Sequence, residues 1–245
     1  MFVRKTLLAA LCATALLPLS AAYAVDSQQF PTEQGSITAT PVAKGLDHPW
    51  ALAFLPDQQG FLVTELPGHL RFCQPGRQAV CALEGRAAGM GQRAGRVCWM
   101  WCCRQTFKQD RLVYLSYAEG GGEGGKAGTA VGRGRLAADL SGLEDFKVIL
   151  RQEPKLSTGN HFGSRLAFDR DGYLFVTLGE NNDRPTAQDL DKLQGKVVRI
   201  YPDGRVPDDN PFVGQPGVRP EIWSYGQRNP QGLALNPWSG TIMGK

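Results

Sequence analysis

Long apolar runs are scarce in this chain of 245 residues. The longest, Leu7 to Leu19, is shorter than the ~20 residues of a transmembrane helix, and no later segment approaches that length. An extended apolar stripe with a period of 3.6 residues is also lacking after this run, which argues against a helical protein. Neither sign of charge predominates, since the formal net charge is only +4. So small an excess argues against a dedicated nucleic-acid binder.

The N-terminus has the pattern of an export signal. A basic start (Arg4 and Lys5) precedes the apolar run, and Ala22-Tyr23-Ala24 is a small-x-small cleavage site. We expect residues 1–24 to be removed by cleavage near Ala24. Removal of the two basic residues would take the formal charge from +4 to +2, because this segment holds no acids. The remaining domain, residues 25–245, is expected to be periplasmic or secreted.

Glycine is abundant, with 30 residues, and the later apolar runs are short. Such runs, separated by turn residues, predict an all-β protein. The clearest example pairs Leu166–Phe168 with Tyr173–Leu178 around the turn Asp169-Arg-Asp-Gly172, whose glycine can take positive φ. His161 lies just ahead of this hairpin. A titratable ring on a loop that enters a rigid hairpin is a common place for a catalytic base.

The same hairpin pattern recurs along the chain. Trp50–Glu65 has the same order of apolar run, Pro-Asp turn and apolar run, a third copy begins at Gly232, and Arg111–Tyr117 is similar to the second half of a fourth. The strands that follow the turns begin near residues 61, 111, 173 and 241, at spacings of 50, 62 and 68. Four-stranded units that recur every roughly 40–50 residues or more are typical of a β-propeller, and a β-sandwich is the alternative.

Residues 73–107 differ from the rest of the chain. Five of the six cysteines fall here, which is an odd number for a disulfide framework, and no nearby histidine completes a usual zinc pattern. Read two bases out of frame, the codons of Val97–Cys103 give (Leu/Met/Val)-Leu-Asp-Val-Val-Leu, an apolar strand ahead of Arg111–Tyr117. We therefore hypothesise a frameshift that removes the first strand of this repeat. The alternative is a genuine Cys/Trp-rich loop, and resequencing codons 70–110 distinguishes the two.

Three motifs resemble one known family. They are Gly159-Asn-His-Phe-Gly-Ser-Arg-Leu166, Leu178-Gly-Glu-Asn-Asn182 and Ser224-Tyr-Gly-Gln-Arg-Asn-Pro-Gln-Gly232. They resemble the soluble aldose sugar dehydrogenases of the glucose/sorbosone dehydrogenase group, which depend on pyrroloquinoline quinone (PQQ). The resemblance implies a six-bladed β-propeller with the cofactor over one end of its central channel. This chain would then be an incomplete fragment of about four blades.

The resemblance implies the oxidation of an aldose sugar to a lactone. His161 would be the general base that takes the proton of the anomeric hydroxyl while the C1 hydride passes to PQQ. Imidazole suits this step because its ordinary pKa of ~6.5 leaves it mostly neutral. Arg228 and Asn229 match family residues that contact PQQ, and a guanidinium fork pairs well with planar oxygen pairs. Gln92 and Asn160 are candidates for contacts to the sugar.

Calcium, which clamps PQQ in the family, is also implied by the resemblance. The chain itself shows no metal site. The calcium-binding segment of the family would follow Lys245. The turn Asp169–Gly172 is not an EF-hand calcium loop, since position 178, where such a loop needs Glu, is Leu. Glu180 and Asp183 are interpreted as turn residues. We expect the chain as written to be nearly inactive, with exposed sheet edges. The electron acceptor is not indicated.

Two alternatives from other classes stay open. A non-catalytic propeller could bind a sugar or a protein through the same face. A calcium-dependent lactonase would need several acidic ligands that face the channel, and the sequence shows no such set. Reconstitution with PQQ and calcium, followed by dye reduction with glucose, separates an enzyme from a binding protein.

Overall fold

The computed structural model describes residues 27–56, 60–74, 98–103 (backbone only), 106–120, 125–157 and 159–245. The chain divides into two compact units, Met1–Thr40 and Pro41–Lys245. In the first unit, β1 (Gln28–Thr32) and β2 (Gly35–Ala39) pair as an antiparallel hairpin. The expected signal peptide, residues 1–24, and the candidate sugar contact Gln92 lie outside the described residues.

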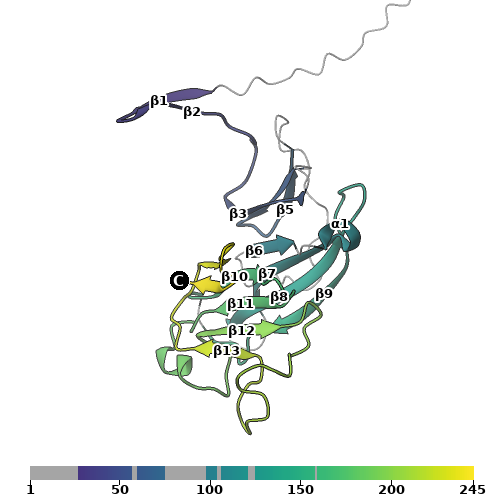
Figure 1. Cartoon of the computed structure of the whole chain (residues 1–245), viewed down its shortest axis with the longest axis vertical. Helices are drawn as coiled ribbons and strands as arrows, with labels where there is room; N and C mark the ends of the chain where they lie inside the picture. The colour runs from purple at the N-terminus through teal and green to yellow at the C-terminus, as the bar shows by residue number, and fades with distance from the viewer. Residues whose placement is uncertain (1–26, 57–59, 75–97, 104–105, 121–124, 158) are drawn as a thin grey trace, which may run out of the picture. The chain divides into compact units, whose positions relative to one another are not determined.

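The second unit contains four antiparallel sheets in which the strands follow chain order (Figure 1). They are β3 (Pro49–Phe54), β4 (Phe61–Glu65) and β5 (Leu70–Cys73); β6 (Cys98–Cys103), β7 (Leu112–Gly120), β8 (Ala127–Leu136) and β9 (Leu143–Arg151); β10 (Gly163–Phe168), β11 (Leu174–Leu178), β12 (Lys196–Ile200) and β13 (Ile222–Tyr225); and β14 (Leu233–Leu235) with β15 (Ile242–Gly244). Only the short α1 (Phe107–Asp110) and η3 (Arg184–Ala187) interrupt them as named helical elements in the described part of the chain. The all-β prediction is confirmed. No helix among the described residues is long and apolar enough to cross a membrane.

The first strands of successive sheets lie side by side. β3 contacts β6, β6 contacts β10, and β10 contacts β14. Apolar side chains fill the spaces between the sheets because alternate residues of a strand point to opposite faces. On β7, for example, Leu115 packs with Leu62 of the first sheet, whereas Tyr114 belongs to the cluster of Val176 in the third. Sheets stacked around their first strands are the blades of a β-propeller, as predicted.

The repeat seen in the sequence extends to individual hydrogen bonds. The hydroxyl of Thr64 on β4 accepts the backbone N–H of Ala51 at 3.2 Å, next to an irregularity at the start of β3. The hydroxyl of Thr177 on β11 accepts the N–H of Arg165 at 2.8 Å, next to a similar irregularity in β10. Both threonines are fully buried. In each of these two strand pairs, a buried hydroxyl accepts the hydrogen bond of a backbone N–H at the point where the ladder is irregular.

The turn Asp169–Gly172 forms as predicted and connects β10 to β11. The N–H of Tyr173 donates to Oδ1 of Asp169 at 2.8 Å, and Gly172 has a φ of 84°. This is the left-handed conformation that glycine adopts without steric cost. The hairpin that follows His161 is thus held by its own turn chemistry.

The expectation that the second repeat lacks its first strand is wrong. β6 occupies that position and pairs with β7 from Cys98 opposite Tyr117 to Cys103 opposite Val113. Two tryptophans lie in this stretch of sequence, and aromatic residues favour strands, so the chain as written can supply the strand. Residues 75–97 lie outside the described part of the chain, and the frameshift itself stays a prediction.

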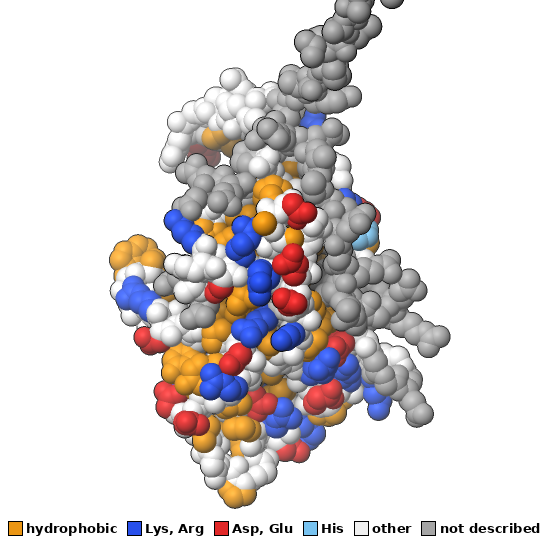
Figure 2. All heavy atoms as spheres, turned by 90° about the vertical axis from the view of Figure 1, so that its right-hand side faces the viewer, with side chains coloured by type: hydrophobic (Ala, Val, Ile, Leu, Met, Phe, Trp, Pro, Cys, Tyr) orange, Lys and Arg blue, Asp and Glu red, His pale blue; other side chains and the backbone are white. Residues whose placement is uncertain are grey.

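Opposite charges are intermingled on the surface. The face in Figure 2 carries Lys and Arg side chains directly beside Asp and Glu side chains, with apolar side chains between them. Ion pairs within one sheet or loop of the described chain include Arg135 with Asp145 and Arg205 with Asp203. This mixing agrees with the small net charge of the sequence.

Candidate active site

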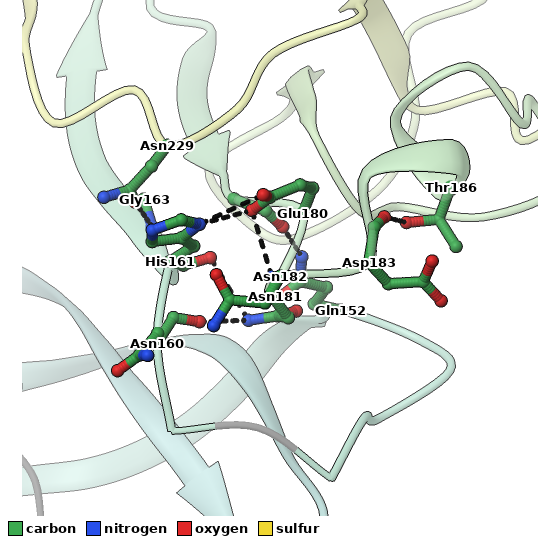
Figure 3. Close-up of polar contacts among 11 residues, drawn as sticks. Gln152, Asn160, His161, Gly163, Glu180, Asn181, Asn182, Asp183, Thr186 and Asn229 are labelled. Carbon is green, nitrogen blue, oxygen red and sulfur yellow. Dashed lines mark hydrogen bonds and ion pairs between the residues drawn. The ribbon is translucent and has the colours of Figure 1, made fainter.

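His161 and Glu180 form a hydrogen-bonded pair at the end of the third sheet (Figure 3). Nδ1 of His161 lies 2.8 Å from Oε2 and 3.0 Å from Oε1 of Glu180. The Glu180 side chain is only 2% exposed, whereas that of His161 is 21% exposed. Because a carboxylate only accepts hydrogen bonds, Nδ1 of the neutral ring carries the proton. Nε2 is then the basic atom.

The register of the sheet explains why these two residues meet. Gly163 at the start of β10 lies opposite Leu178 at the end of β11. His161, two positions before Gly163, is therefore next to Glu180, two positions after Leu178. The interpretation of Glu180 as a turn residue is correct, since the N–H of Asp183 donates to its carbonyl at 3.0 Å. Sequence reasoning missed the contact with His161, which the hairpin register was sufficient to indicate.

The backbone of His161 is held in a left-handed conformation, with a φ of 53°. The backbone N–H of Asn181 donates to its carbonyl oxygen at 3.3 Å, and the side-chain amide of Asn181 does so at 3.2 Å. Gly179 lies so close that a Cβ there would overlap this oxygen. The loop therefore requires glycine at this position, and strain of this kind is typical of functional sites.

The neighbouring sheet also fixes the loop. The buried hydroxyl of Thr129, on β8, donates to the carbonyl of Phe162 at 2.6 Å. The buried Gln152 accepts the N–H of Thr129 at 3.0 Å and donates to the carbonyl of Gly179 at 2.7 Å. These bonds connect the second sheet to both sides of the His161–Glu180 pair. The pair is therefore positioned by rigid strands, as a catalytic group needs.

The segment that follows β13 runs past the same pair. The backbone carbonyl of Arg228 accepts the N–H of Glu180 at 2.9 Å. Oδ1 of Asn229 accepts the N–H of Gly163 at 3.0 Å, which leaves the amide NH2 of Asn229 available to a ligand. The hydroxyl of Thr177 donates to the carbonyl of Pro230 at 2.8 Å. This segment is thus attached to the hairpin that carries the histidine.

A buried lysine holds the segment between β11 and β12, residues 179–195, in place. Nζ of Lys196 donates to the carbonyl oxygens of Thr186, Ala187 and Gln194 at 3.1, 3.1 and 2.6 Å. Burial lowers the pKa of Lys196 to about 8. The carbonyl of Ala187 also accepts the N–H of Gly226 at 2.9 Å. The segment between β11 and β12 therefore packs against the start of the segment after β13, which carries Arg228.

An open cavity of about 390 Å³ lies beside the imidazole and is lined by His161, Gln227, Arg228, Asn229, Pro230 and Lys245. The structure thus brings together three of the residues predicted from the sequence: His161, Arg228 and Asn229. Asn160 does not line this cavity. Its side chain is exposed, and its carbonyl oxygen accepts the side-chain amide of Asn181 at 3.2 Å.

The donor set of the cavity suits an organic anion. Arg228 and Lys245 contribute two cations, and Asn229 contributes an amide NH2. Across the described ranges, no group of three or more His, Cys, Asp or Glu side chains could hold a metal ion. A base beside cationic donors can remove a proton from a substrate while negative charge gathers on an acceptor.

Comparison with known proteins agrees with this arrangement. The sequence model of the glucose/sorbosone dehydrogenase family matches residues 46–245. The aldose sugar dehydrogenase YliI of Escherichia coli (strain K12) is 57% identical over 201 residues, which are 80% of this chain and 53% of that protein. The chain spans about half the length of the curated relatives it matches.

Solved structures show the same likeness. The soluble aldose sugar dehydrogenase from Escherichia coli in the apo-form superposes with a TM-score of 0.74 at 57% identity, over 80% of this chain and 56% of that one. The PQQ-bound form of aldose sugar dehydrogenase from Streptomyces coelicolor superposes with a TM-score of 0.67 at 27% identity, over 83% of this chain and 57% of that one.

Proposed function

Because this chain belongs to the glucose/sorbosone dehydrogenase family, we propose that it carries the catalytic base of a PQQ-dependent aldose dehydrogenase. The observation that carries the proposal is the His161–Glu180 pair at a cavity that Arg228 also lines. The proposed reaction is the oxidation of the anomeric carbon of an aldose to a lactone. Export to the periplasm or out of the cell is part of the proposal, on the pattern of residues 1–24.

The chain's own residues manage the proton. Nε2 of His161 accepts the proton of the anomeric hydroxyl as C1 loses a hydride, so the C1–O bond becomes the carbonyl of the lactone. Glu180 keeps the ring oriented through Nδ1 and stabilises the imidazolium that forms. Bound PQQ supplies the ortho-quinone that takes up the hydride. The sugar thus loses one hydride and one proton.

The cofactor contacts proposed for this chain are Arg228 and Asn229. PQQ is planar and carries three carboxylates, and a guanidinium pairs with such oxygens through two parallel hydrogen bonds. The PQQ-bound relative from Streptomyces coelicolor supports the choice of cofactor. Calcium is proposed as a second requirement from the family resemblance. Since the described residues provide no metal cluster, we assign it no ligand and no step.

Dye reduction with glucose, in the presence of PQQ and calcium, tests the proposal. The 245-residue chain would be compared with a completed version, which carries the Escherichia coli relative's sequence in place of residues 73–107 and after Lys245. We expect the completed version to reduce dye and the 245-residue chain to show little turnover. Binding of PQQ by the completed version without any dye reduction would contradict the proposal and favour a non-catalytic propeller.

His161→Asn in the completed version should lower turnover at least about a hundredfold, since general base catalysis contributes that much or more. Circular dichroism and the thermal midpoint should stay unchanged, because the ring is partly exposed and not part of the core. His48→Asn is the matched control, since its exposed ring lies next to the start of β3 and is hydrogen-bonded to the adjacent Asp47. Equal turnover of the two variants would remove His161 from the mechanism.

A further inference from the structure

Lys245 is a second cation at the cavity. The register of β14 and β15 ends with Leu233 opposite Gly244, and the next pair is Gly232 with Lys245. The N–H of Gly232 donates to the Lys245 carbonyl at 3.0 Å, and the N–H of Lys245 donates back at 2.9 Å. The backbone of Lys245 therefore extends the pairing of the fourth sheet by one residue, and Lys245 is among the residues that line the cavity beside His161.

The two cations at this cavity are not part of an ion pair with any described residue. Among the described residues, neither Arg228 nor Lys245 has a carboxylate within ion-pair distance. Glu180, the acid behind the imidazole, is buried and already accepts bonds from His161 and from the N–H of Asn182. Two cations that have no ion-pair partner among the described residues raise the local concentration of anions at the cavity. The site therefore favours a ligand with more than one negative charge.

We propose that Lys245 and Arg228 together bind carboxylates of PQQ. This inference rests on the proposed function and adds a cofactor contact to it. A neutral aldose offers no charge to a second cation, whereas PQQ has three carboxylates and can present one to each side chain. Lysine binds such oxygens as a point charge, so its contribution depends on charge more than on geometry.

The test is a titration of the 245-residue chain with PQQ, in calcium, followed by quenching of protein fluorescence. PQQ trimethyl ester is the second probe, because it keeps the quinone and lacks the negative charges. We expect Lys245→Met to weaken the binding of PQQ about five- to tenfold, with the ester unaffected. Lys245→Arg should retain most of the affinity. The loss should shrink as the salt concentration rises.

Lys147→Met is the matched control, since it removes one positive charge from an exposed residue of β9 that does not line the cavity. Its PQQ affinity should equal that of the unchanged chain. If Lys245→Met bound PQQ as tightly as the unchanged chain does, or lost as much affinity for the ester as for PQQ, the assignment of Lys245 would be overturned. The proposed function would still stand. Failure of the unchanged chain to bind PQQ at all would also overturn the assignment of Lys245, whereas dye reduction by the completed version decides the proposed function separately.

Discussion

At the scale of single residues, the proposed chemistry depends on which nitrogen of His161 carries the proton. Glu180 decides this because both of its oxygens lie within 3.0 Å of Nδ1. The N–H of Asn182 donates to Oε2 at 3.2 Å and keeps the carboxylate in place. Nε2 remains as the proton acceptor. Glu180 is thus a positioning residue that acts through the histidine.

Glu180→Gln in the completed version should therefore lower kcat at least about tenfold. The amide of glutamine can donate to Nδ1, and the imidazole proton would then sit on Nε2, where it blocks proton transfer. Stopped-flow dye reduction measures the effect, and PQQ affinity should change little. Asp183→Asn is the control, because Asp183 is exposed and takes part in the turn through its backbone. Full activity of the Glu180→Gln variant would refute the positioning role.

At the scale of elements, a threonine of the second strand supports the first strand in both the first and the third sheet, and β11 also supports the site. Thr177 connects β10 to the segment after β13, since it accepts the N–H of Arg165 and donates to the carbonyl of Pro230. Thr64 makes the matching bond to Ala51 in the first sheet. A comparison of variants at Thr64 and Thr177 therefore distinguishes the loss of sheet stability from the loss of support for the site.

Thr177→Val and Thr64→Val should each reduce the free energy of unfolding by about 1–3 kcal/mol, because a buried amide loses its acceptor. Only Thr177→Val should also weaken PQQ binding, since it releases the segment that carries Arg228 and Asn229. Urea unfolding and PQQ titration measure the two effects. Equal PQQ affinities of the two variants would show that the Thr177–Pro230 bond does not support the site.

Glu119 connects the edge of the second sheet to the loop that leads to His161. It accepts hydrogen bonds from Arg151 on β9 and from Lys155. Burial raises the pKa of the Glu119 carboxyl, but the bonds from Lys155 and Arg151 outweigh burial, and the pKa lies below its usual value. A lowered pKa in the folded state means that Glu119 stabilises the fold above its unfolded pKa. That contribution is lost as the pH falls through the folded value.

Glu119→Gln should therefore reduce the free energy of unfolding at pH 7 by about 1–2 kcal/mol, a value discounted because Arg151 is half exposed. The difference from the unchanged protein should shrink as the pH is lowered from about 5 to about 3. Urea unfolding across this range gives the curve. Glu144→Gln, an exposed carboxylate on β9, should show neither effect. A difference that is constant with pH would contradict the linkage.

At the scale of the whole second unit, the first sheet presents an exposed apolar face. Trp50, Leu52 and Phe54 alternate along β3 and are 50%, 48% and 73% exposed. Leu52 and Phe54 follow the irregularity at the start of β3 and therefore share a face, because alternate residues of a strand point to the same side. An apolar cavity of about 340 Å³ lies on the same sheet. Contiguous apolar surface of this kind promotes association.

The 245-residue chain should therefore self-associate as its concentration rises. Leu52→Ser combined with Phe54→Ser should weaken this association at least about tenfold, since burial of each side chain contributes about 1.5–3 kcal/mol. Size-exclusion chromatography with light scattering measures the apparent mass. Val213→Ser, which changes an exposed apolar residue in another loop, is the control. An unchanged mass in the double variant would exclude this face as the contact surface.

The sequence by itself determined the β class, the repeat and the turn at Asp169–Gly172, because short apolar runs and turn residues act locally. Its motifs also indicated His161, Arg228 and Asn229, which the structure places at one cavity. Other features depended on tertiary pairing. Strand register brings Glu180 to His161, and the pairing of β14 with β15 brings Lys245 to the cavity that Arg228 lines. The strand β6 likewise formed where sequence reasoning expected none, because its partner β7 supplies the hydrogen bonds. Contacts between segments far apart in the chain have no local signature, and only the packed sheets could decide them.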